Sequence, residues 1–128
     1  MRLLLDTHAL IWWGHQDPRL GAVAMAAIAA ESSAVFVSAV SAIEIATKHR
    51  LGKLPEAAVL AARFETEIEA LGFLPLPVTL VHARCAGSLD IPHKDPFDRL
   101  LIAQAMVENM LLVSNETVFD GYGVSRLW

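Results

Sequence analysis

Short apolar segments alternate with helical ones along this chain, and this alternation restricts the fold more than any other feature of the sequence. The segments at 2–5 (RLLL), 34–38 (AVFVS) and 111–114 (LLVS) are rich in leucine and β-branched residues, which is typical of buried strands. Between them lie stretches of helical pattern, and the one at 56–71 places its apolar residues on one face. The alternation predicts an α/β fold with three layers, in which helices cover both faces of a central, mostly parallel sheet.

Two helix starts are signalled by an aspartate that precedes a proline. An N-cap aspartate accepts a hydrogen bond from the first turn, and proline suits the first helical position because that residue needs no amide donor. Asp17-Pro18 therefore predicts a helix over 17–31, and Asp95-Pro96 predicts a second one that leads into the strand near the C-terminus.

The composition narrows the possible functions. The 128 residues are 55% hydrophobic and 19% charged, which predicts one globular domain over 1–128 with a sizeable core. The single cysteine, Cys85, excludes an intramolecular disulfide framework, and no segment has the pattern of a signal peptide or a membrane span. We therefore expect a cytoplasmic protein with no membrane partner. Acidic residues outnumber basic ones by 14 to 10, so a nucleic-acid-binding site on this chain would need a bound cation.

Carboxylates recur at the places where a parallel sheet binds ligands, beyond the carboxyl ends of its strands. Asp6 directly follows the first predicted strand, and Glu44 lies in the second turn of the helix after the second strand. Asp98 lies in the first turn of a later helix, and Glu116 follows the next strand by two residues. Clustered carboxylates repel one another, so they persist only when a cation bridges them or when one of them stays protonated. Hard divalent cations such as Mg²⁺ and Mn²⁺ prefer oxygen ligands of this kind.

Each of these acids also has a purely structural interpretation. Asp6 suits a turn or the cap of the next helix, and Asp95 suits an N-cap. Asp98 can complement the dipole of its helix. Glu44 and Lys48 have the spacing of a surface ion pair worth roughly 0.3–0.5 kcal/mol. The five histidines show no zinc-ligand spacing, so packed or surface positions are expected for them.

Several segments resemble one known family, in the same order along the chain. MRLLLDTHALIWW, SAIEIATKHRLGKL, HKDPFDRLLIAQA and LLVSNETVF are similar to motifs of the PIN-domain ribonucleases, and in particular to the toxin component of VapBC toxin–antitoxin systems. The resemblance implies a PIN-like three-layer fold and endoribonuclease activity, in which a metal-activated water hydrolyses RNA. It also implies a homodimer and a cognate antitoxin that binds over or near the acidic pocket.

The family's acidic site falls on Asp6, Glu44 and Asp98, which the resemblance makes the catalytic residues and the ligands of Mg²⁺ or Mn²⁺. The family's fourth acid is usually an aspartate, and here Glu116 stands in its place. Because glutamate is longer by one methylene, we expect Glu116 to bind metal through water or not at all. Candidate orienting groups or alternative ligands are Asp95, Thr7, Ser114 and Asn115, and candidate phosphate contacts are Lys94, Arg99, Lys48 and Arg50.

Three other functional classes require different residues at these positions or leave the acids without a catalytic role. Haloacid-dehalogenase phosphatases need a second acid two residues after the first, and here that residue is His8. A phosphoacceptor receiver domain needs an aspartate after its third strand, which FLPLPV does not supply. A non-catalytic α/β binding or regulatory module with a degenerate acidic site is the alternative that the sequence leaves open, as it does the RNA target and the number of metal ions.

Overall fold

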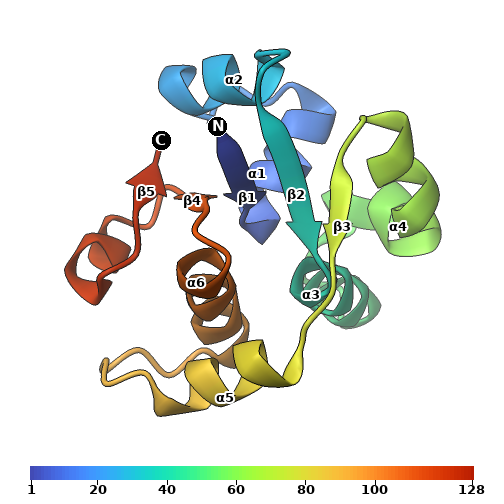
Figure 1. Ribbon diagram of the computed structural model, residues 1–128. Helices are drawn as coiled ribbons and strands as arrows, with labels where there is room; N and C mark the ends of the chain where they lie inside the picture. The colour runs from blue at the N-terminus through green and yellow to red at the C-terminus, as the bar shows by residue number, and fades with distance from the viewer.

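The central sheet in the computed structural model, which describes residues 1–128, has five strands and is parallel throughout (Figure 1). The strand order is β3-β2-β1-β4-β5, so the first strand lies at the centre. This arrangement confirms the predicted α/β class. The strands are β1 (Arg2–Leu5), β2 (Ala34–Ser38), β3 (Leu74–Leu76), β4 (Leu111–Val113) and β5 (Arg126–Leu127).

Six α-helices and two 3-10 helices connect these strands. Their bounds are α1 (Thr7–His15), α2 (Ala22–Ala29), α3 (Ala39–Arg50), η1 (Pro55–Ala57), α4 (Ala58–Ala70), α5 (Leu80–Ser88), α6 (Pro96–Val107) and η2 (Thr117–Tyr122). No helix combines the length and the apolar character that crossing a bilayer requires.

Two hydrophobic cores lie on opposite faces of the sheet. Leu3 and Leu5 pack with apolar residues of α1, α2 and α4, whereas Leu4 packs with residues of α6 and with Phe119 of η2. All three leucines are fully buried. Both faces of β1 are therefore covered by helices, which is why this strand is an unbroken leucine run with no polar residue in alternation.

The chain reverses its direction of travel across the sheet at β1. It builds outward through β2 and β3, and then crosses by α5 and α6 to β4 on the other side of β1. Such a switch point leaves a crevice at the carboxyl ends of the two strands that flank it, here β1 and β4. Asp6 lies at that crevice, and its backbone amide donates to the Val113 carbonyl at 3.0 Å.

The helix predicted over 17–31 begins later than its Asp-Pro signal suggests. The Asp17 carboxylate accepts from the backbone amide and the guanidinium of Arg19, at 2.9 and 2.8 Å, and so stabilises a turn instead of capping a helix. Helix α2 starts at Ala22 after Gly21. The same signal at Asp95-Pro96 is confirmed, because α6 begins at Pro96 with Asp95 as its cap.

Candidate metal centre

A polar pocket of about 160 Å³ lies at the crevice between β1 and β4. It has no hydrophobic residue in its lining, and its residues come from separate parts of the chain. The structure thus brings together the four acids that the sequence analysis singled out, with a fifth acid and a single lysine. The lining residues are Asp6, Thr7, His8, Glu44, Lys48, Asp95, Asp98 and Glu116.

Asp6 is both the cap of a helix and a wall of this pocket. Its Oδ1 accepts from the Ala9 amide at 2.8 Å and so caps α1, while the residue is only 8% exposed. Burial raises the pKa of Asp6 to about 6, although hydrogen bonds from Ser114 and Ala9 favour the charged form, and the nearby charge of Asp98 adds to the rise. The carboxylate is therefore in a place where a cation would stabilise it.

Glu44 is held by hydrogen-bond donors on both of its oxygens. Oε1 accepts from the Thr7 hydroxyl at 2.6 Å, and Oε2 accepts from the Lys48 ammonium at 2.5 Å. Since a carboxylate can only accept, the Thr7 hydrogen points at Glu44, and the Ser41 hydroxyl at 3.1 Å must donate to Thr7. Burial lowers the pKa of Lys48, but the hydrogen bond to Glu44 and the charges of Glu44, Asp95 and Asp98 together outweigh that effect, and the net shift is upward.

Asp98 is oriented by a histidine that the sequence analysis did not select. The His93 Nε2 lies 2.7 Å from Asp98 Oδ2, and the Tyr122 hydroxyl lies 3.4 Å from His93 Nδ1. Burial raises the pKa of Asp98, and the charges of Asp95 and Glu44 act in the same direction against the effect of His93. The five-residue separation of His93 from Asp98 matches no metal-binding motif, so the only signal in the sequence was its place within HKDPFDR.

The remaining acidic and hydroxyl candidates differ in how close they come to the pocket. Asp95 lines it while its Oδ1 accepts from the Phe97 and Asp98 amides. Ser114 is fully buried, hydrogen-bonds Asp6 and accepts from the Glu116 amide at 3.1 Å. Glu116 lines the pocket with an exposed side chain. Asn115 is exposed and does not line the pocket.

Of the four basic candidates, only Lys48 lines the pocket. Lys94 and Arg50 are exposed elsewhere. The Arg99 guanidinium is directed at backbone carbonyls of the segment between α5 and α6 and of the end of α5. Its acceptors are the carbonyls of Ala86, Leu89, Ile91 and His93, at 2.6–3.2 Å. Arg99 therefore stabilises the segment that carries His93 to the pocket.

Lysine in place of Arg99 is expected to destabilise the protein by about 1–3 kcal/mol. The ammonium group is a single point and cannot reach four carbonyls that a planar guanidinium spans. Urea unfolding measures the loss, with exposed Lys94→Ala as the control that stays within about 0.5 kcal/mol of the wild type. Equal stability of Arg99→Lys and the wild type would contradict this role.

The chemistry of the pocket suits a hard divalent cation. Its acidic donors are carboxylate oxygens, which Mg²⁺ and Mn²⁺ prefer, and no cysteine lines it. The side chains do not form a preassembled group of three or more metal-binding residues. Glu44 is hydrogen-bonded to Lys48, and Asp98 lies in hydrogen-bond contact with His93. The Lys48 ammonium is itself a cation at a carboxylate of the pocket.

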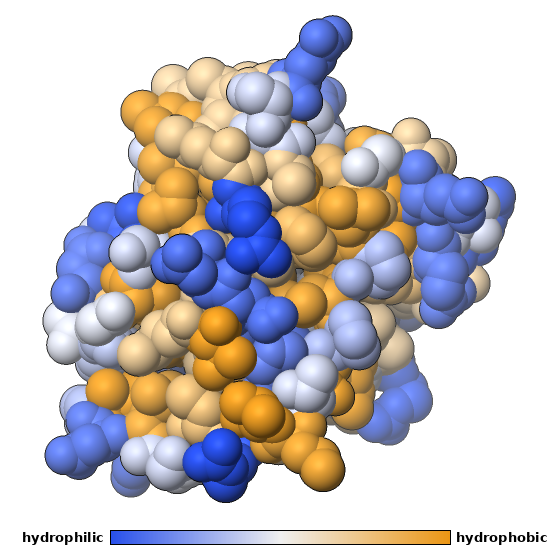
Figure 2. All heavy atoms as spheres, in the orientation of Figure 1, coloured by the Kyte–Doolittle hydropathy of each residue, from blue (hydrophilic) through white to orange (hydrophobic).

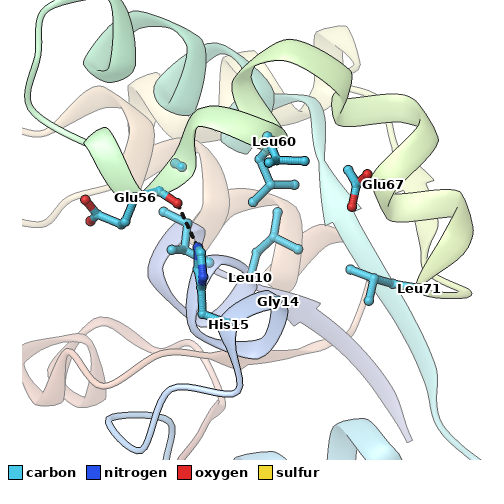
Figure 3. A pocket seen from close by; sticks show the side chains of 10 residues that line it. Leu10, Gly14, His15, Glu56, Leu60, Glu67 and Leu71 are labelled. Carbon is cyan, nitrogen blue, oxygen red and sulfur yellow. Dashed lines mark hydrogen bonds between the residues drawn. The ribbon is translucent and has the colours of Figure 1, made fainter.

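A second hollow of about 250 Å³ lies between α1 and the η1–α4 segment and has a different character (Figure 3). Leu10, Leu60 and Leu71 are among its lining residues, and the His15 Nε2 lies 2.7 Å from the Glu56 carbonyl. It shares no residue with the acid pocket. With this mostly apolar lining, it lacks the carboxylate set that would hold a cation.

Comparison with known proteins agrees with the fold. The sequence profile of the PIN domain matches residues 3–124. Among curated protein sequences, none is significantly similar to this chain. The crystal structure of VapBC2 from Rickettsia felis, bound to a DNA fragment from its promoter, contains a chain with a TM-score of 0.70 and 15% identity, over 100% of this chain and 98% of that one. A toxin–antitoxin complex from Klebsiella pneumoniae contains another, with a TM-score of 0.65 and 18% identity, over 94% of this chain and 92% of that one.

Proposed function

This chain belongs to the PIN domain family, and from that premise we propose that it is a metal-dependent endoribonuclease, the toxin of a toxin–antitoxin pair. The observation that carries the proposal is the pocket at the β1–β4 crevice, which collects Asp6, Glu44, Asp98 and Glu116 from four parts of the chain. Asp6 and Glu44 are buried and Asp98 is half-buried, and carboxylates held close together in such places are unfavourable without a cation. The same cation would supply the positive charge that an acidic protein lacks for binding RNA.

In this proposal Asp6, Glu44 and Asp98 would hold Mg²⁺ or Mn²⁺, and Glu116 would reach the metal through water or not at all. A bound divalent cation supplies a water nucleophile at neutral pH and offsets the charge on the phosphate oxygens. Other groups of the protein hold the three carboxylates in place. Asp6 is oriented by the Ala9 amide and by Ser114. Glu44 is oriented by the Ser41–Thr7 pair, and Asp98 by His93.

The direct test is cleavage of a mixed RNA substrate by the purified protein, with sequencing of the fragment ends. We expect cleavage with Mg²⁺ or Mn²⁺ and its loss when EDTA removes the metal, because no side chain in the pocket can replace the cation at the phosphate. Sequencing the ends also identifies the target among transfer, ribosomal and messenger RNA. Intact RNA under all metal conditions would instead favour the non-catalytic α/β binding module.

Replacing His93 with asparagine is expected to weaken Mn²⁺ binding by about 10- to 100-fold, the range found for groups that orient a ligand without touching the metal. Asparagine is too short to reach Asp98 Oδ2 from a backbone position that suits the imidazole. Isothermal titration calorimetry measures the change. His15→Asn is the matched control, since His15 contacts Glu56 in the apolar hollow. Equal effects of the two variants would contradict the orienting role.

The partner part of the proposal has two supports. The two similar structures are described as toxin–antitoxin complexes, and this chain has apolar side chains at its surface. Leu80 is 90% exposed and Val81 48% exposed on α5, and apolar atoms reach the surface over this lower part of the face in Figure 2. Exposed apolar groups are typical of interfaces. A homodimer and a cognate antitoxin in the cytoplasm are therefore proposed, and light scattering of the chain alone and after co-expression with a candidate antitoxin tests both.

A further inference from the structure

Among the four candidate phosphate contacts, only Lys48 lies in the acid pocket, where it is paired with one particular carboxylate. Its Nζ donates to Glu44 Oε2 at 2.5 Å, and its side chain is 32% exposed, against 7% for Glu44. Asp95 and Asp98 line the same pocket. The ammonium therefore lies within the field of several carboxylates, which stabilises its positive charge.

Both carboxylate oxygens of Glu44 accept a hydrogen bond. Thr7 occupies Oε1 with a neutral hydroxyl, and Lys48 occupies Oε2 with a full positive charge. Asp98 differs, because His93 contacts Oδ2 and leaves Oδ1 without a hydrogen-bond partner. A divalent cation can therefore reach Asp98 beside its histidine, whereas at Glu44 it would meet the like charge of the ammonium.

We propose that Lys48 is a built-in counter-ion, which holds the cation position at Glu44 in the metal-free protein and leaves Glu44 Oε2 when a divalent cation binds. The proposal rests on the proposed function of the pocket. It gives a role to the ion pair that Lys48 makes with Glu44 inside a pocket lined by five carboxylates. In this exchange the single positive charge of the Lys48 ammonium is replaced by the two positive charges of the divalent cation.

The structure of the lysine side chain makes the exchange feasible. The ammonium is carried on a flexible four-carbon stem, and part of it already reaches solvent, so it can move outward without repacking the core. Its departure breaks one charge-assisted hydrogen bond to the buried Glu44 carboxylate. That loss reduces the affinity for metal, since every binding event must first break it.

The test is Mn²⁺ binding to EDTA-stripped protein, measured by isothermal titration calorimetry on the wild type and on Lys48→Met. Methionine keeps the length of the stem and removes the charge. We expect Mn²⁺ to bind Lys48→Met about tenfold more tightly, which corresponds to one charge-assisted hydrogen bond that no longer competes. Lys53→Met is the matched control, because it removes the same charge from an exposed position outside the pocket, and its affinity should stay within about twofold of the wild type.

Two further measurements separate the possible outcomes. Metal-free Lys48→Met should melt at a lower temperature than the wild type, and saturating Mn²⁺ should raise its melting temperature by more. If methionine prevents folding, Lys48→Gln removes the charge and places a shorter, neutral polar side chain at the same position, and it should tighten Mn²⁺ binding in the same direction by a smaller factor.

Unchanged or weaker Mn²⁺ binding by the Lys48 variants, with normal binding by the wild type, would overturn the counter-ion role alone. It would mean that Lys48 stays on Glu44 as a support for the occupied site. Absence of Mn²⁺ binding by the wild type itself would overturn the proposed function of the pocket, and with it this inference.

Discussion

Asparagine in place of Asp6 is expected to abolish RNA cleavage and, at neutral pH, to stabilise the metal-free protein. The loss of cleavage follows from the position of Asp6 at the switch point of the sheet, in a pocket with three other candidate ligands. An amide is a poor ligand for a hard divalent cation, because it brings no negative charge. We expect the rate to fall at least about 100-fold, the upper range for changes to groups that only orient ligands.

The gain in stability follows from the direction of the pKa shift. The pKa of Asp6 rises from 3.8 to about 6 because the carboxylate is buried. The folded state therefore holds a proton that the unfolded state has released between those two values, and stability contributed by this group falls as the pH rises through that window. Above the window the ionised carboxylate costs about 3 kcal/mol, which asparagine avoids while its carbonyl still accepts from the Ala9 amide.

Urea unfolding of metal-free wild type and Asp6→Asn from pH 4 to pH 8 measures this difference. The two proteins should be nearly equal at the low end and should diverge to a plateau above pH 6. Asp90→Asn, at an exposed site outside the pocket, is the control and should follow the wild type within about 0.5 kcal/mol throughout. A difference that does not change with pH would contradict the assigned cause.

Mn²⁺ should stabilise the wild type much more than it stabilises Asp6→Asn. A cation that binds only the folded state raises the melting temperature in proportion to its affinity. Mn²⁺ is therefore expected to raise the melting temperature of the wild type and to have little effect on Asp6→Asn, so that the order of stability narrows or reverses when metal is added.

Methionine in place of Gln104 is expected to destabilise the protein by about 2–4 kcal/mol. Gln104 is fully buried on α6 and joins three other parts of the fold. Its Oε1 accepts from the Ser38 hydroxyl at 2.5 Å, and its Nε2 donates to the Pro77 carbonyl at 3.2 Å and lies 3.3 Å from His82 Nδ1. Methionine has a similar shape, so the loss comes from the polar groups that it leaves unpaired rather than from a cavity.

A double-mutant cycle with Ser38→Ala checks that interpretation. Ser38→Ala alone should cost about 1 kcal/mol, because the Ser38 hydroxyl also caps α3 by accepting from the Val40 amide. In the double variant no hydroxyl is left without an acceptor, so the combined loss should be smaller than the sum by about 1 kcal/mol. Strict additivity would show that the two side chains do not depend on each other.

The elements of the fold that depend on local patterns could be predicted from the sequence. The leucines of β1 and the β-branched residues of β2 indicate buried strands, and Asp95-Pro96 indicates the start of α6. The same local signal failed at Asp17, where a nearby arginine competes for the carboxylate. A local pattern shows which residue can cap a helix, but the competing donor decides whether it does.

Contacts of the site between distant residues could not be predicted in this way. In the sequence, His93 is a lone histidine, and only the structure shows that it contacts Asp98. Arg99 is one of four possible phosphate contacts in the sequence, and only the structure shows that its guanidinium donates to four backbone carbonyls. Asp6 presented a choice between a helix cap and a site residue. The structure shows that one carboxylate serves as the cap and also lines the pocket.

The sequence by itself therefore determined the parallel α/β class and the acids that follow its strands, since hydrophobic periodicity and capping act over a few residues. The tertiary structure alone decided that β1 is central, that the crevice opens between β1 and β4, and that Lys48 faces Glu44 inside it. The reason is that strand order and the burial of charge depend on packing between segments far apart in the chain, and packing of that kind leaves no periodic pattern in the sequence.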